Sequence, residues 1–157
     1  MKPSIKTGVS FGLTSGVITT LGLLVGLHAG TQSRAAVLGG ILTIAVADAL
    51  SDALGIHITE EAHNRGSTHV WESTAATFAV KFLSAASFAL PVLLFPLAQA
   101  VTLSILWGLG LLALFSWLMA RSQRLSPWMI VGEHLLIALA VIAATYYVGR
   151  WVGGAAG

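Results

Sequence analysis

The sequence contains no cysteine and few charged residues. The absence of cysteine excludes disulfide bonds and thiolate metal ligands. Only 9% of the 157 residues are charged, against about 25% in an average soluble protein. Too few polar side chains are therefore present to cover a soluble globule, and 56% of the residues are hydrophobic. We predict an all-α integral membrane protein whose main partner is the lipid bilayer.

The charges that are present do not indicate an enzyme or a nucleic-acid-binding protein. The net charge of +2 rests on few groups, and no basic patch with interleaved aromatic residues occurs. No phosphate-binding loop and no nucleophile–base spacing is visible, so neither catalysis nor a cofactor is expected. The N-terminus lacks a small-residue cleavage site, and we interpret it as a cytosolic tail and not a signal peptide.

Long apolar runs predict five transmembrane helices in a single domain of residues 1–157. A span needs about 20 mostly apolar residues, and the candidates are 8–28, 36–58, 73–95, 99–119 and 128–149. Pro91 and Pro96 should kink or close the third span. Cytosolic loops carry an excess of Lys and Arg. That rule favours the N-terminus inside and the C-terminus outside, because Lys2, Lys6, Arg65, Arg121 and Arg124 then face the cytosol.

Glycines recur every fourth residue along the first predicted helix. One row is Gly8, Gly12 and Gly16, and a second is Gly22, Gly26 and Gly30. Small residues at this spacing let two helix backbones approach closely in lipid. Two interpretations follow: a homodimer or pore built on the first helix, or packing against another helix of the same chain.

Two aspartates, Asp48 and Asp52, interrupt the second apolar run. A charged side chain in the bilayer centre costs roughly 2.5–3.5 kcal/mol, so it requires a partner or a function. Four residues apart on a helix, the two carboxylates lie about 40° apart on one face. Gly55, Thr59 and His63 continue this stripe toward the cytosol. The stripe could carry ions or protons, or its members could be paired structurally.

Two further ionisable residues fall at a similar predicted depth. Lys81 lies about eight residues into the third span, and Glu133 about six residues into the fifth. We predict a buried network of Asp52, Lys81 and Glu133 that leaves Asp48 as the free carboxylate. Such a network could couple proton movement to transport, or it could simply clamp three helices together.

The predicted cytosolic hairpin of residues 60–72 is a second candidate site. Two pairs, Glu60 with His63 and His69 with Glu72, have the i, i+3 spacing that places both side chains on one helix face, as in di-metal carboxylate bundles. Glu61 lies between them, and carboxylate with imidazole suits Fe, Mn, Zn or Co. The sequence therefore predicts metal recruitment here, with a solvated helix end as the alternative.

Three short runs resemble the motifs of the vacuolar iron transporter family. Ser15-Gly-Val-Ile-Thr19-Thr20 resembles that family's first-helix Asp-Gly-x-x-Thr-Thr. Ala47-Asp48-Ala-Leu-Ser-Asp52-Ala-Leu-Gly55 resembles its second-helix Ala-Asp-x-x-Ser-Met-x-x-Gly-Glu-Tyr. Thr145-Tyr146-Tyr-Val-Gly149 resembles its closing Thr-Tyr-x-x-Gly. The resemblance implies five spans and proton-coupled export of Fe²⁺ or Mn²⁺ by a homodimer whose first helices line the path.

The chain departs from these motifs at chemically important positions. Ser15 stands where the family has aspartate, Asp52 where it has methionine, and Ile56-His57 where it has Glu-Tyr. The inserted cytosolic metal-binding domain of many members is missing, and a prokaryotic cell membrane is expected in place of a vacuole. We expect a divalent-metal/proton antiporter, in which Asp48 and Asp52 act with Ser15, Thr19 and Thr20. The alternatives are a transporter of another solute with Lys81 as counter-charge, or a non-transporting subunit of a membrane complex.

Overall fold

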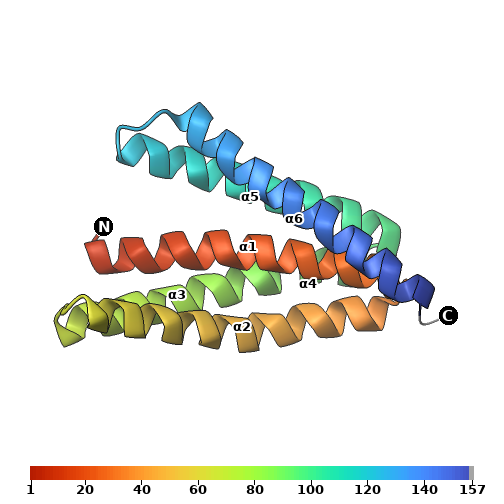
Figure 1. The fold of residues 1–157 in the computed structure, drawn as a ribbon, viewed down its shortest axis with the longest axis horizontal. Helices are drawn as coiled ribbons and strands as arrows, with labels where there is room; N and C mark the ends of the chain where they lie inside the picture. The colour runs from red at the N-terminus through yellow and green to blue at the C-terminus, as the bar shows by residue number, and fades with distance from the viewer. Residues whose placement is uncertain (156–157) are drawn as a thin grey trace.

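The computed structural model describes residues 1–155, which form helices joined by short turns (Figure 1). The elements are α1 (Pro3–Thr31), α2 (Arg34–Ala62), α3 (Ser67–Ser87), α4 (Ala89–Leu94), α5 (Leu97–Ser122) and α6 (Pro127–Ala155). Five segments are long and apolar enough to cross a membrane, with α3 and α4 together making the third. The all-α membrane architecture is therefore confirmed, and each helix extends beyond the predicted span at one or both ends.

The third segment is interrupted at Phe88, between α3 and α4. Pro91 explains the break, because a proline ring inside a helix collides with the carbonyl four residues earlier, which here belongs to Ser87. Pro96 then precedes α5 as its N-cap residue. The predicted kink is confirmed, and it lies one helical turn before the first of the two prolines.

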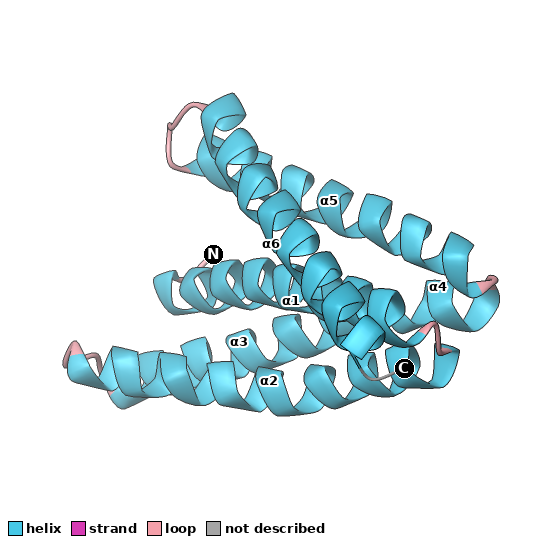
Figure 2. Ribbon diagram, turned by 45° about the vertical axis from the view of Figure 1, so that its right-hand side comes forward, coloured by secondary structure: helices cyan, strands magenta, loops and turns pink. Residues whose placement is uncertain are grey.

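Helix α1 lies at the centre of the bundle. In both ribbon views it runs between the α2–α3 pair and the α5–α6 pair (Figures 1 and 2), and it packs against α2, α3, α5 and α6. Its buried apolar side chains, such as Val17, Leu21 and Leu24, meet Phe88 and Leu112 in the core. Large apolar side chains on the other helices face outward, as a lipid environment requires.

The two glycine rows of α1 pack against helices of the same chain. A Cβ added at Gly8 would lie 2.5 Å from the Ser73 carbonyl oxygen of α3, and one at Gly12 would lie 2.7 Å from that of Thr77. A Cβ added at Gly30 would lie 2.9 Å from the Gly149 carbonyl oxygen of α6. The intrachain interpretation of the glycines is therefore correct, and they no longer argue for a dimer through α1.

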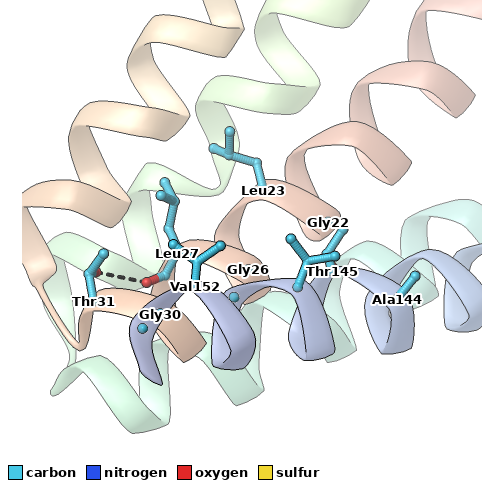
Figure 3. A pocket seen from close by; sticks show the side chains of 12 residues that line it. Gly22, Leu23, Gly26, Leu27, Gly30, Thr31, Ala144, Thr145 and Val152 are labelled. Carbon is cyan, nitrogen blue, oxygen red and sulfur yellow. Dashed lines mark hydrogen bonds between the residues drawn. The ribbon is translucent and has the colours of Figure 1, made fainter. Parts of the chain in front are cut away.

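Close approach of glycine backbones also leaves an apolar groove between α1 and α6. The groove has a volume of about 500 Å³ and is lined by Gly22, Gly26 and Gly30 on one side and by Thr145 and Val152 on the other (Figure 3). Its lining offers little for a polar ligand. The side of α1 that faces α2 and α3 is chemically different, because its hydroxyl groups contact ionisable residues of those two helices.

Candidate functional site

Lys81 of α3 is the most unusual side chain of the described structure. It is 1% exposed, and its Nζ lies 2.6 Å from Asp48 Oδ2. Nζ also forms an ion pair with Asp52 Oδ2 and donates a hydrogen bond of 2.9 Å to Ser15 Oγ. An ammonium group has three protons to donate. Lys81 therefore finds an oxygen for each of them while its charge is removed from solvent.

Two hydroxyl groups of α1 complete the cluster on the other side of the carboxylates. Ser15 Oγ donates to Asp52 Oδ2 at 2.7 Å while accepting the bond from Lys81. Thr19 Oγ1 lies 3.1 Å from Asp48 Oδ2 and 2.8 Å from the Ser15 carbonyl oxygen, so one hydroxyl proton serves both acceptors. We call Ser15, Thr19, Asp48, Asp52 and Lys81 the acidic cluster.

Small residues on all three helices make this cluster possible. The buried side of α2 consists of Ala45, Ala49 and Ala53 at four-residue spacing, so α2 comes close to its neighbours while the aspartates lie beside the contact. Gly16 of α1 lies against α3, since a Cβ there would stand 2.3 Å from Ser84 Oγ and 3.2 Å from Lys81 Cγ. Any larger residue at position 16 would therefore compete with Lys81 for space.

The cluster is open on one edge and negatively charged. The Asp48 side chain is 28% exposed and that of Asp52 is 21% exposed. Both carboxylates contact the lysine and the hydroxyls through Oδ2, and among the described residues neither Oδ1 has a hydrogen-bond partner. With one ammonium between two carboxylates, the net charge is −1. Two free carboxylate oxygens at an open edge are suited to binding a cation.

The structure corrects two details of the predicted network. Asp48 is not free, because it shares Lys81 with Asp52. Glu133 is exposed and lies on α6, a helix that packs against α1 and α5 and not against α3. Helix periodicity does not indicate the lateral position of a helix in the bundle, and Glu133 does not belong to the network for that reason. The Asp52–Lys81 pair itself is confirmed.

Thr20 also lies outside the acidic cluster. One residue on from Thr19, it points about 100° away around the helix, where its hydroxyl is fully buried and has no partner among the described residues. At the predicted cytosolic end of the stripe, Thr59 and His63 are exposed, and His63 Nδ1 lies 2.7 Å from the Thr59 carbonyl oxygen. Only the aspartates of the predicted stripe therefore join the site.

The turn between α2 and α3 brings together one pair of the predicted metal ligands. His69 Nε2 lies 2.9 Å from Glu60 Oε2, whereas Glu61 turns back toward His57 at 3.5 Å. Glu72 instead contacts the start of α1, with Lys2 Nζ at 2.5 Å. Across residues 1–155 no group of three or more His, Asp or Glu side chains is placed to hold a metal ion. The two i, i+3 pairs thus meet only through Glu60 and His69, because Glu61 and Glu72 contact other basic groups.

A polar contact between α5 and α6 was not predicted from the sequence. Ser116 Oγ and His134 Nδ1 are 2.7 Å apart, and Ser116 is fully buried. No spacing rule signals a pair that comes from two different helices. The only available hint was a serine and a histidine at similar depth in adjacent spans.

Comparison of the chain with protein-family models, with curated proteins and with solved structures finds no match. The function must therefore be argued from the acidic cluster and its surroundings.

Proposed function

We propose that this chain is a membrane transporter that exports a divalent transition-metal ion, Fe²⁺ or Mn²⁺, from the cytosol in exchange for protons. The observation that carries the proposal is the buried ammonium of Lys81, which two intramembrane carboxylates hold from one side while their other oxygens stay free. Ionisable residues inside transmembrane segments mark ion pathways and proton relays far more often than plain structural contacts.

Charge balance explains why a metal ion and a proton would exchange at this site. A divalent cation on Asp48 and Asp52 neutralises both carboxylates and leaves the ammonium of Lys81 buried without a counter-charge. Burial disfavours an uncompensated charge strongly, so Lys81 releases a proton when the cation binds. Proton return to Lys81 from the opposite side of the membrane then weakens the hold on the metal and releases it.

The donor atoms favour a hard or borderline cation. The acidic cluster offers carboxylate and hydroxyl oxygens only, and such ligands suit Mn²⁺ and related ions better than Cu⁺ or other thiophilic metals. Asp48 occupies the acidic position of the motif that the second helix resembles, and Asp52 adds a carboxylate where that motif has a thioether. This substitution supports a preference for Mn²⁺ over softer ions.

A homodimer is part of the proposal, and it would use the open edge of the cluster. Partly exposed carboxylates are costly against hydrocarbon, so a protein surface should cover them. Beside them, α2 presents the small exposed residues Thr43, Ala47, Ser51 and Gly55 at four-residue spacing, which permits close helix contact in lipid. A second copy packed along α2 and the adjoining face of α1 would enclose both acidic clusters.

Flux measurements in proteoliposomes test the proposal. Vesicles containing the protein, a metal-sensitive dye and a pH-sensitive dye should show Mn²⁺ or Fe²⁺ movement with protons moving the opposite way. Asp48→Asn should abolish both signals, while Glu61→Gln, a matched acid outside the cluster, should leave them intact. Movement of neither metal, or metal movement unaffected by Asp48→Asn in a folded protein, would contradict the proposal.

A further inference from the structure

A pocket with one basic side chain and a mostly apolar wall lies between the beginning of α1 and the end of α5. Toward the end of the bundle that holds the N-terminus, the α5–α6 pair diverges from α1 (Figures 1 and 2), and a cavity of about 320 Å³ is present there. Its lining includes Lys6 of α1 and Phe115, Leu118, Met119 and Ser122 of α5. We call it the α1–α5 pocket. Packing of two helices in lipid does not require a lysine at this place.

The positive charge of Lys6 is not balanced by an acidic side chain. Across residues 1–155 Lys6 forms no ion pair, whereas Lys2, its neighbour on α1, is paired with Glu72. Arg121 near the end of α5 and Arg124 in the turn that follows also have no acidic partner within the described part of the chain. Unpaired cations gathered at one end of the bundle favour an anionic ligand.

Aromatic side chains indicate that this end of α5 lies at the level of the lipid headgroups. Trp117 of α5 and Trp128 of α6 are in edge-to-face contact, with ring centroids 4.7 Å apart, and Arg121 lies 5.8 Å from the Trp117 ring centroid. Tryptophan and basic residues near the end of a transmembrane helix are typical of the membrane–water interface. Ser122 directly follows Arg121, whereas Phe115 lies roughly 10 Å further along α5 toward the bilayer centre. The α1–α5 pocket therefore extends from the interface into the hydrocarbon.

From this arrangement we infer that the α1–α5 pocket binds one anionic phospholipid, with its phosphate at Lys6 and Ser122 and an acyl chain along Phe115 and Leu118. The ammonium and hydroxyl groups donate hydrogen bonds, which phosphate oxygens accept. Basic pockets between transmembrane helices bind acidic headgroups in this way. A free phosphate fits less well, because the apolar wall offers it no partner. The lipid would occupy the space that α5 leaves where it diverges from α1.

The inference is independent of the acidic cluster and of transport. The α1–α5 pocket lies between α1 and α5, whereas Ser15 and Thr19 contact the aspartates of α2. None of the residues of the acidic cluster lines the pocket. Asp52→Asn should therefore leave lipid binding unchanged even if it abolishes Mn²⁺ flux.

Native mass spectrometry of the purified full-length protein in detergent tests this inference, with phosphatidylglycerol and phosphatidylcholine of identical acyl chains as the probes. The wild type should bind phosphatidylglycerol at least about fivefold more tightly, because one lysine near an anionic headgroup contributes that much. Lys6→Gln should remove most of this preference. Arg124→Gln is the matched control, because it removes an unpaired charge at the same end from a residue that does not line the pocket. It should leave the preference intact.

A second pair of variants tests the position of the acyl chain. Leu118 is 56% exposed and lines the pocket, so Leu118→Trp should preserve the fold, obstruct the pocket and weaken the binding of both lipids. Leu114, one helical turn earlier on α5, is 60% exposed and does not line the pocket. Leu114→Trp should therefore leave lipid binding unchanged.

Several results would overturn the inference. Equal binding of the two lipids by the wild type would show that the headgroup charge is not recognised. Equal losses in Lys6→Gln and Arg124→Gln, or in Leu118→Trp and Leu114→Trp, would show that lipid binds without using this pocket. Displacement of phosphatidylglycerol by inorganic phosphate would show a site for the free anion in place of a lipid site.

Discussion

Neutralising both aspartates should destabilise this protein far more than either single change. In Asp52→Asn, Lys81 keeps its ion pair with Asp48 and its bond to Ser15, so the loss is that of one charge-assisted hydrogen bond, about 1.5–3 kcal/mol. In Asp48→Asn/Asp52→Asn, an ammonium that is 1% exposed has no counter-charge left. Breaking a buried ion pair in this way costs about 3–5 kcal/mol, and the loss of both partners should reach or exceed the upper end.

The cause can be isolated by removing the charge of the lysine as well. Lys81→Met has nearly the same shape, and replacement of a whole buried ion-pair network by neutral residues is often harmless or stabilising. The triple variant Asp48→Asn/Asp52→Asn/Lys81→Met should therefore recover most of the stability that the double variant loses. Glu133→Gln is the control, since Glu133 is exposed and lies outside the cluster, and it should change stability by less than about 0.5 kcal/mol.

The stability of these variants is measured by thermal unfolding in detergent or nanodiscs, with size-exclusion chromatography of the protein that remains folded. The order of stability should be wild type, then the triple variant close to it, then Asp52→Asn, with the double variant lowest. If the triple variant is as unstable as the double variant, the uncompensated charge of Lys81 is not the cause, and the proposed electrostatic coupling is wrong.

Two further comparisons test the packing and the hydroxyl groups by thermal unfolding and Mn²⁺ flux. Gly149→Ala should destabilise the protein by about 1–3 kcal/mol, because its Cβ would overlap the Gly26 carbonyl oxygen. Gly110→Ala, whose Cβ would meet no atom within 4 Å, should cause no loss. Equal effects of the two changes would contradict the packing. Thr19→Val should lower flux and cost about 1 kcal/mol by removing a bond to Asp48. Thr20→Val should be neutral or stabilising, because its hydroxyl is buried without a partner, and a flux defect there would contradict the assigned orientation of α1.

Hydrophobic run length and proline position predicted much of the fold. The five spans follow from the need to satisfy every backbone group within a helix in lipid, and the break before Pro91 follows from proline sterics. The lateral arrangement of the helices could not be predicted in the same way. Glu133 illustrates this, since its predicted depth is similar to that of Lys81 while its helix packs against α1 and α5.

Part of the candidate site could likewise be predicted from the sequence, and part could not. Asp48 and Asp52 were recognisable because a carboxylate in an apolar run is energetically anomalous, and Lys81 because it is the one cation at matching depth in the neighbouring span. Their sharing of a single ammonium depends on rotamers and on Gly16, which no spacing rule reveals. The turn between α2 and α3 shows the opposite error. The i, i+3 spacing of Glu60 with His63 and of His69 with Glu72 predicted a metal site, but in the structure only Glu60 and His69 meet, and Glu72 pairs with Lys2.

The central claim is that a divalent cation and the charge of Lys81 compete for Asp48 and Asp52. The most direct measurement is the number of protons that the purified protein releases per Mn²⁺ bound, determined in weakly buffered solution with a pH indicator. The account predicts about one proton per ion for the wild type, because a buried ammonium without its counter-charge gives up its proton, and clearly fewer for Lys81→Met. Saturable Mn²⁺ binding at Asp48 and Asp52 with no proton release from the wild type would contradict it.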